Sequence, residues 1–136
     1  DEMQSILQNE LQARRYEKNM IIRRDVESKE KTIQYISEIR QQLQTLKQKP
    51  SMTKYQAEIN DILNATNEYE SLFSKLASIM LTGKSSDSDL SSLEPAMIAT
   101  ARNIGKISEK IINEEKIAMD EDLAYFHYKI IILSTI

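Results

Sequence analysis

Four cationic side chains stand close together near the start of the chain: Arg14, Arg15, Lys18 and Arg23. Guanidinium groups bind carboxylates through two parallel hydrogen bonds, and they are less strongly hydrated than ammonium groups. A small organic anion is therefore the ligand that this set of residues suits. We take these four residues as the candidate ligand-binding site.

The cluster lies on what the spacing predicts to be the apolar face of a helix. Steps of four, three and four residues place four side chains on that face: Leu11, Arg15, Lys18 and Ile22. Arg15 and Lys18 thus occupy positions where a helix normally has apolar core residues. Such departures from the apolar pattern are expected at functional or strained sites. We therefore expect Arg15 and Lys18 to line a partly buried polar site that faces the last helix.

An ion-pair network is the structural alternative to a ligand site. Counting inward from both ends of the chain places the cations opposite Glu114 and Glu115 of the last helix. The arginines can pair with these acids between helices, or Arg14 can pair with Glu10 or Glu17 along its own helix. An arginine held by one carboxylate keeps free donors, so ion pairing and ligand binding are compatible.

The composition limits the class of protein. The 136 residues fit one domain, and two glycines and two prolines leave few places to turn, which favours a few long helices over a sheet. A net charge of −3 argues against a nucleic-acid binder, and zero cysteines exclude disulfides and zinc–thiolate sites. The single histidine, His127, lacks metal-ligand spacing. We predict no enzyme, no cofactor and no metal site.

The sequence predicts an all-α fold, an antiparallel bundle of long helices. The first helix is expected from residue 2 to residue 48, because the residue before Pro50 avoids the helical region. Its apolar stripe continues from Ile22 through Val26, Ile33, Ile36, Leu43 and Leu46. The second helix is expected over residues 51–81, with a heptad seam at Met52, Tyr55, Ile59, Ile62, Thr66, Tyr69, Phe73, Leu76 and Met80.

The last part of the chain leaves the number of helices open. Residues 82–91 are rich in Ser and Asp and predict a loop, and Ser91 or Ser92 can cap the next helix with Pro95 in its first turn. If both chain ends lie at one membrane surface, three helices are not enough. Either residues 82–91 run back along the bundle, or residues 87–104 form a fourth, short helix that ends near Gly105.

An apolar run follows an aromatic collar at the C-terminal side. Residues 125–129 contain two tyrosines, a phenylalanine and a lysine, and residues 130–136 are mostly isoleucine. The run is shorter than the roughly 20 residues that a membrane span needs, but aromatic residues and Lys are typical of a membrane interface. We expect residues 1–129 to form the domain and residues 130–136 to begin a transmembrane helix. The alternative is an amphipathic helix end that packs on a neighbouring core.

Residues 13–25 resemble the start of a known sensor family. The pattern Arg-Arg-x-Glu-Lys, an apolar run and Arg-x-Asp is similar to that of the helical bimodular, four-helix-bundle type sensor domains of bacterial chemoreceptors and related transmembrane receptors. The matching residues are Arg14, Arg15, Glu17, Lys18, 20–22, Arg23 and Asp25. Asn19 and Met20 depart from the family pattern, which usually has an aspartate and often an aromatic residue there. Full members are much longer, with two stacked bundles.

The resemblance implies an extracytoplasmic ligand-sensing domain of a bacterial transmembrane signalling receptor, of the methyl-accepting chemotaxis protein or sensor-kinase type. The expected location is the periplasmic side of the inner membrane, with flanking membrane spans and a homodimer in the full receptor. The expected stimulus is a small organic acid or a partner protein, not nucleic acid. The alternative is a structural coiled-coil adaptor without a small-molecule ligand, in which the ionic cluster only fixes the helix register.

Overall fold

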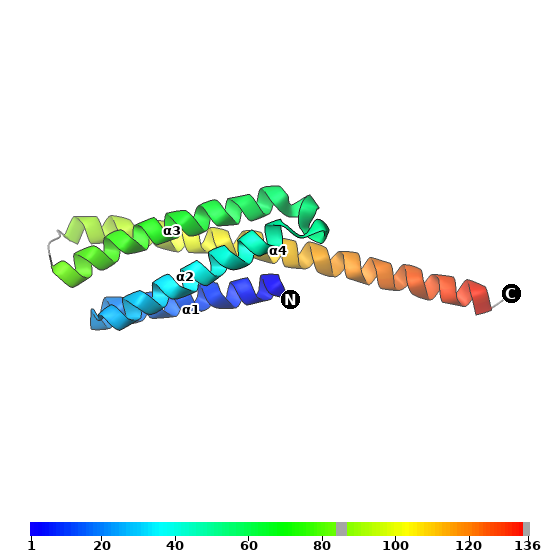
Figure 1. Ribbon diagram of the computed structural model, residues 1–136, viewed down its shortest axis with the longest axis horizontal. Coiled ribbons are helices and arrows are strands. Elements are labelled where there is room, and N and C mark those ends of the chain that lie inside the picture. The colour runs from blue at the N-terminus through cyan, green and yellow to red at the C-terminus, as the bar shows by residue number, and fades with distance from the viewer. Residues whose placement is uncertain (84–86, 135–136) are drawn as a thin grey trace.

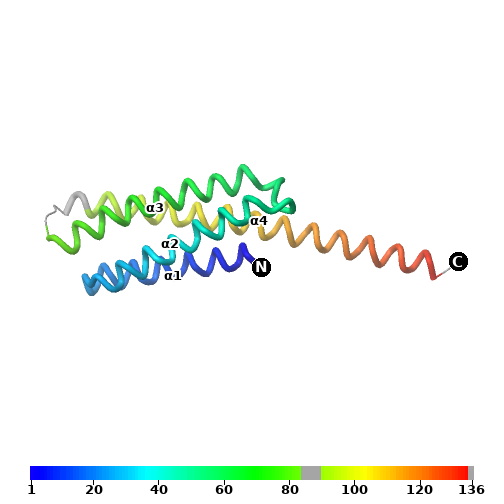
Figure 2. The backbone as a smooth tube through the Cα atoms, in the orientation of Figure 1, coloured from blue at the N-terminus to red at the C-terminus, as the bar shows by residue number. Residues whose placement is uncertain are grey.

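The computed structural model describes residues 1–83 and 87–134, and over these residues the chain forms an all-α, up-down bundle (Figures 1 and 2). The fold class expected from the sequence is confirmed. Successive helices run antiparallel, with α1 packed against α2 and α4, and α3 packed against α2 and α4. The elements are α1 (Glu2–Arg23), α2 (Val26–Lys47), the short 3-10 helix η1 (Pro50–Tyr55), α3 (Gln56–Thr82) and α4 (Asp87–Ser134).

A tight turn at Arg24 and Asp25 divides the expected first helix into α1 and α2, so the prediction of one helix over residues 2–48 is wrong. Arg24 has a left-handed backbone (φ 52°), and its N–H donates to the carbonyl of Met20 over 2.7 Å. Asp25 has an extended backbone, and its carboxylate accepts hydrogen bonds from the N–H and the hydroxyl of Ser28 at 3.1 and 3.0 Å. This is an N-cap, which begins α2 in the opposite direction.

The second predicted boundary and the seam of the following helix are confirmed. Lys49 is extended and Pro50 begins η1, as expected of a proline that cannot continue a helix. Every predicted seam position from Met52 to Met80 is buried. The residues facing them from α2, which include Ile36, Leu43 and Leu46, are also buried.

Helix α4 runs without interruption from Asp87 to Ser134, so the predicted break at residues 103–105 is wrong. Gly105 lies inside the helix, and Pro95 lies beyond its first turn. The helix begins before Ser91, and of the loop expected over 82–91, residues 84–86 fall outside the described part of the chain. The fourth antiparallel pass comes from the α1–α2 hairpin, which removes the need for a short extra helix.

The buried face of α1 is not the predicted one. Its core residues are Met3, Ile6, Ala13, Glu17 and Met20. The ends of the predicted stripe face solvent instead, with exposed fractions of 65% for Leu11 and 80% for Ile22. Val26, which continues that stripe onto α2, is also exposed. The stripe assignment is therefore wrong for α1.

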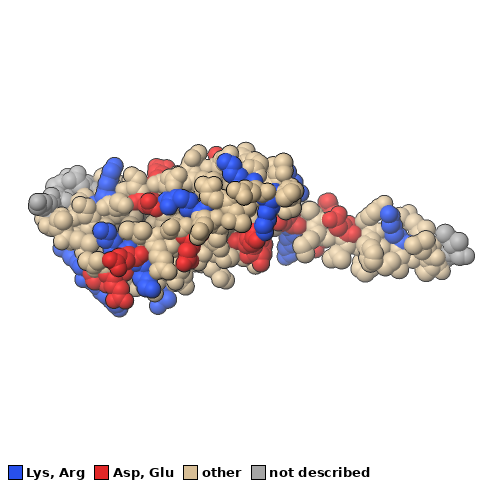
Figure 3. Space-filling view, viewed as in Figure 1, with Lys and Arg blue, Asp and Glu red and all other residues tan. Residues whose placement is uncertain are grey.

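Helix α4 extends well beyond the bundle, past the end at which the N-terminus lies (Figure 1). Asp1, Met3 and Glu115 line one cleft where α4 leaves the bundle. Every residue from 119 to 134, which we call the projection, is exposed. The projection contains three acids next to the bundle, at residues 120–122, and Lys129 further along, and the rest of its visible face is mostly uncharged (Figure 3). Within residues 1–83 and 87–134, none of the helices combines the length and the hydropathy needed to cross a membrane.

Candidate functional site

Three charged residues of α1 point toward the other helices at the middle of the bundle. Glu10, Arg14 and Glu17 follow one another by steps of four and three residues, which places them along one side of α1. Tyr69 of α3 reaches the same place from the opposite side. We call Glu10, Arg14, Glu17 and Tyr69 the ionic cluster.

Glu17 is the centre of the ionic cluster, and its side chain is almost fully enclosed. The residue is 4% exposed, and its Oε1 accepts a hydrogen bond from Arg14 Nη1 at 2.6 Å. The same oxygen accepts a hydrogen bond from the hydroxyl of Tyr69, which is 3% exposed. Hydrogen bonds to an ionised group are roughly twice as strong as neutral ones. The bond from Tyr69 joins α1 to α3, so it fixes the position of these diagonal helices relative to each other.

Burial decides how the acids of the ionic cluster titrate. Loss of hydration raises the pKa of Glu17 above its ordinary value, although Tyr69 and Arg14 act to lower it. Burial acts to lower the pKa of Arg14, but Glu17 and Tyr69 outweigh it, so this pKa ends above its ordinary value. Burial and the adjacent Glu17 together raise the pKa of the Tyr69 hydroxyl, which stays protonated and donates.

Glu10 differs from Glu17 because it has no direct partner. Its side chain is half-buried, and no hydrogen bond or ion pair to it occurs among the residues that the structure describes. Burial raises the pKa of Glu10 from 4.5 to about 7, with Arg14 acting to lower it and Glu17 acting to raise it further. A carboxyl group in this state can donate or accept a proton at neutral pH.

A small cavity lies next to the ionic cluster, where all four helices meet. The space open to the centre of a water-sized sphere is about 10 Å³, which is room for at most one water. The lining residues come in pairs from α1, α2, α3 and α4: Glu10 and Ala13, Ile36 and Ile39, Thr66 and Tyr69, Ala101 and Ile104. The cavity is too small for an organic ligand.

The structure separates the four cations proposed as a ligand site. Arg14 lies in the ionic cluster, whereas Arg15, Lys18 and Arg23 are exposed. Arg15 and Lys18 do not line a buried polar site, so that expectation is wrong. Arg15 and Lys18 remain neighbours on the exposed surface of α1, since residues three apart adjoin on a helix. Arg23 lies in the last turn of α1, where a cation favours the helix dipole.

The expected pairing of the arginines with Glu114 and Glu115 does not occur among the described contacts, and Arg14 pairs with Glu17 along its own helix as the alternative predicted. The acid of α4 that acts on Glu17 is Glu94. The prediction assumed that the two chain ends lie at the same level of the bundle. Because the projection extends past the N-terminus, the cations lie opposite an earlier part of α4 than predicted.

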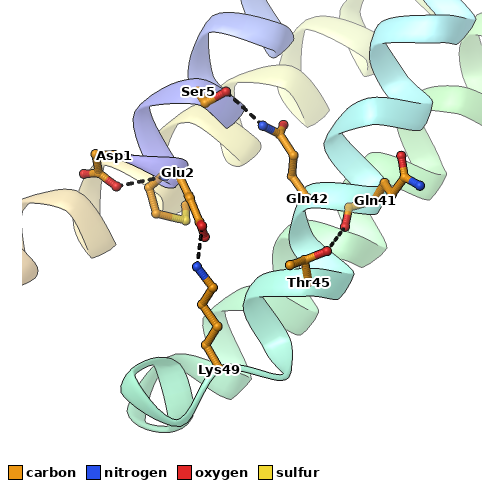
Figure 4. A network of polar contacts seen from close by, with 8 residues as sticks. Asp1, Glu2, Ser5, Gln41, Gln42, Thr45 and Lys49 are labelled. Carbon is orange, nitrogen blue, oxygen red and sulfur yellow. Dashed lines mark hydrogen bonds and ion pairs between the residues drawn. The ribbon is translucent and has the colours of Figure 1, made fainter.

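Other polar contacts tie the helices together outside the ionic cluster. Gln42 of α2 donates to Ser5 at 2.8 Å, and Lys49 pairs with Glu2 (Figure 4). Gln42 also accepts a hydrogen bond from Asn9 at 2.9 Å. Arg40 pairs with Glu70 of α3 at 2.5 Å. These contacts are exposed or half-exposed, so each contributes little to stability.

Sequence reasoning named the members of the ionic cluster on α1 only as ion-pair partners, and it took Tyr69 as an ordinary core residue. The signal was present, because Glu10, Arg14 and Glu17 share the helix face of Ile6, Ala13 and Met20. Within the described residues, no group of His, Asp or Glu side chains is arranged to hold a metal ion. The sequence matches no family model, and neither curated proteins nor solved structures give a significant match.

Proposed function

We propose that the chain is the extracytoplasmic sensory domain of a bacterial transmembrane signalling receptor, of the chemotaxis-receptor or sensor-kinase type. The observation that carries the proposal is the unbroken α4, which belongs to the bundle at one end and forms the projection at the other. A change in packing around α4 moves the projection as one rigid rod. Small shifts of one helix are a known means of passing a signal between sites.

The surface of the projection supports contact with lipid. Ile130, Ile131, Ile132 and Leu133 are all at least 41% exposed, and successive residues lie about 100° apart around a helix. A single partner helix would cover only one stripe, whereas lipid covers the whole circumference. The collar before this run has Lys129 Nζ 4.7 Å from the centre of the Tyr125 ring, a combination typical of membrane interfaces.

A topology experiment tests this proposal directly, because the natural chain has no cysteine and single cysteines can be introduced cleanly. Ala57→Cys on the exposed side of α3 and Ile131→Cys in the projection are produced in bacterial cells and treated with a membrane-impermeant maleimide. We expect labelling of the first from the periplasmic side and protection of the second. Labelling of Ala57→Cys only after cell lysis would exclude an extracytoplasmic domain.

The stimulus that we propose is a small organic acid or a partner protein that contacts the outer side of α1. Arg15 and Lys18, which are both exposed, offer neighbouring donors there. A screen of small carboxylates should raise the melting temperature of the wild type, and the shift should be absent from Arg15→Ala/Lys18→Ala. Lys31→Ala removes an exposed cation of α2 and serves as the control. A shift that survives in the double variant would locate the ligand elsewhere.

A parallel homodimer is part of the same proposal, with α1 contributing to the interface. Leu11 and Ile22 are exposed on the outer face of α1, and two-fold pairs are the commonest assembly. Flanking spans would raise the effective concentration of the two copies. Disulfide crosslinking of single cysteines along α1 in membranes should give a helical periodicity, and a flat profile would count against the dimer.

A structural adaptor bundle is the second candidate. It is favoured by the pairing of Arg14 with Glu17 inside one helix, which leaves that guanidinium less available to a ligand. The topology experiment separates the two candidates, since an adaptor does not require protection of residue 131 by a membrane.

A further inference from the structure

The ionic cluster carries an excess of negative charge when all its acids are ionised. Glu10 and Glu17 share one guanidinium, that of Arg14, and the Tyr69 hydroxyl is neutral. Glu94 of α4 adds a smaller repulsion toward Glu17. Burying an uncompensated charge is costly, so the protein gains stability if one acid of the cluster takes up a proton.

The groups that face Glu10 compensate its charge only in part. On its own helix, Arg14 attracts Glu10, but no hydrogen bond joins these two side chains among the described residues, and Nη1 of Arg14 is bonded to Glu17, which repels Glu10. From α2 the cavity presents Ile36 and Ile39, and from α4 it presents Ala101 and Ile104.

From α3 the cavity presents two hydroxyl groups that are already in use. Thr66 donates to the carbonyl of Ile62 at 2.8 Å, and Tyr69 donates to Glu17. No donor among the described lining residues is therefore left for the Glu10 carboxylate, except through the one water that the cavity can hold.

We propose that the ionic cluster is a proton-binding site in which Glu10 takes up the proton, and that its protonation state sets how tightly α1 packs against α4. The ligand is a hydronium-derived proton from solvent, which forms the O–H bond of a neutral carboxylic acid. This proposal goes beyond a receptor function, because it holds for the isolated bundle with or without a membrane.

The direction of the pH response follows from the raised pKa of Glu10. The folded state binds this proton up to about pH 7, whereas the unfolded chain releases it near the ordinary value of 4.5. Between these two values the folded state holds more protons, so stability falls as the pH rises and is lowest above pH 7. Burial raises the pKa of Glu17 too, so its contribution has the same sign.

Ionised Glu10 places charge beside Ala101 and Ile104 of α4. We therefore expect α1 and α4 to separate slightly at alkaline pH. Because α4 is continuous, the projection would move with it.

Carbon-detected NMR of the glutamate side-chain carboxyl groups, on the whole chain from pH 4.5 to 9, tests the assignment. We expect one carboxyl resonance with a midpoint near pH 7 in the wild type, and its absence from Glu10→Gln. A wild type in which every glutamate titrates below pH 6 would overturn the proposal, as would a resonance near pH 7 that persists in Glu10→Gln. The wild-type titration alone is decisive if the variant folds poorly.

Denaturation with urea gives a second, independent readout. The urea midpoint of the wild type should be lower at pH 8.5 than at pH 5.5, and Glu10→Gln should lose most of this difference. Glu38→Gln is the matched control, since Glu38 is a half-buried carboxylate of α2 outside the ionic cluster. An equal drop in all three proteins would refute the role of Glu10 and would leave the membrane proposal untouched.

Discussion

The middle of the bundle and the projection both depart from the rule that charge faces water and apolar side chains face a core, but in opposite directions. The ionic cluster encloses charged groups and compensates them with one hydrogen bond within α1 and one from α3 to α1. The projection exposes apolar side chains, and no described residue covers them. The first departure is compensated by partners within the bundle, whereas the second is not compensated by any described residue.

This difference shows that one helix can change its chemical role along its length without changing its backbone. Within the bundle, Met97, Ile104 and Ile111 of α4 are buried against the other helices. In the projection, Phe126 and Ile131 of the same helix are exposed. The helix itself is set by local hydrogen bonds, whereas the stability that each side chain contributes is set by its neighbours.

The largest expected effect comes from a matched pair of phenylalanines. Phe73 is fully buried and Phe126 is 59% exposed. Phe73→Ala should lower the free energy of unfolding by about 3–5 kcal/mol, because it opens a cavity in the core. Phe126→Ala should change it by less than about 0.5 kcal/mol. Urea denaturation measures both, and a large loss from Phe126→Ala would mean that the projection folds back on the bundle.

Breaking the ionic cluster should have the next largest effect. Arg14→Ala leaves Glu17 buried without its cation, which should cost about 3 kcal/mol of stability at pH 7.5. Arg14→Leu/Glu17→Leu removes both charges and should recover much of this loss, because two apolar side chains can replace a buried pair at little cost. Arg15→Ala is the control and should stay within about 0.5 kcal/mol of the wild type. Equal effects of Arg14→Ala and Arg15→Ala would contradict the burial that we describe.

A smaller change sharpens the same comparison. Tyr69→Phe removes the hydroxyl that donates to Glu17 and should lower stability by about 1.5–3 kcal/mol, as expected for a hydrogen bond to a charged group. Tyr125→Phe removes a hydroxyl from the projection and should have no measurable effect on unfolding. If both variants unfold like the wild type, Glu17 is satisfied by water and the ionic cluster is more open than the structure indicates.

Local chemistry explains why some elements were predictable. The heptad seam of α3 repeats along residues that are all buried, so periodicity alone identified it. The hairpin between α1 and α2 was also encoded locally, by an N-capping aspartate at residue 25 with Ser28 three residues later. It was missed because apolar residues at helical spacing continue across the turn, and because Arg24 is not the glycine usually found in a left-handed position.

The sequence by itself determined the helical class, the seam of α3 and the presence of cations and acids on α1. The tertiary structure decided which face of α1 is buried. Two nearly opposite faces of α1 carry apolar residues interrupted by charge: one has Ile6 and Ala13 with Glu17, and the other has Leu11 with Arg15. Tyr69 makes the first face the stable choice, because its hydroxyl satisfies Glu17 from 52 residues away. No local pattern contains that partner, and only the packing of α3 against α1 brings it there.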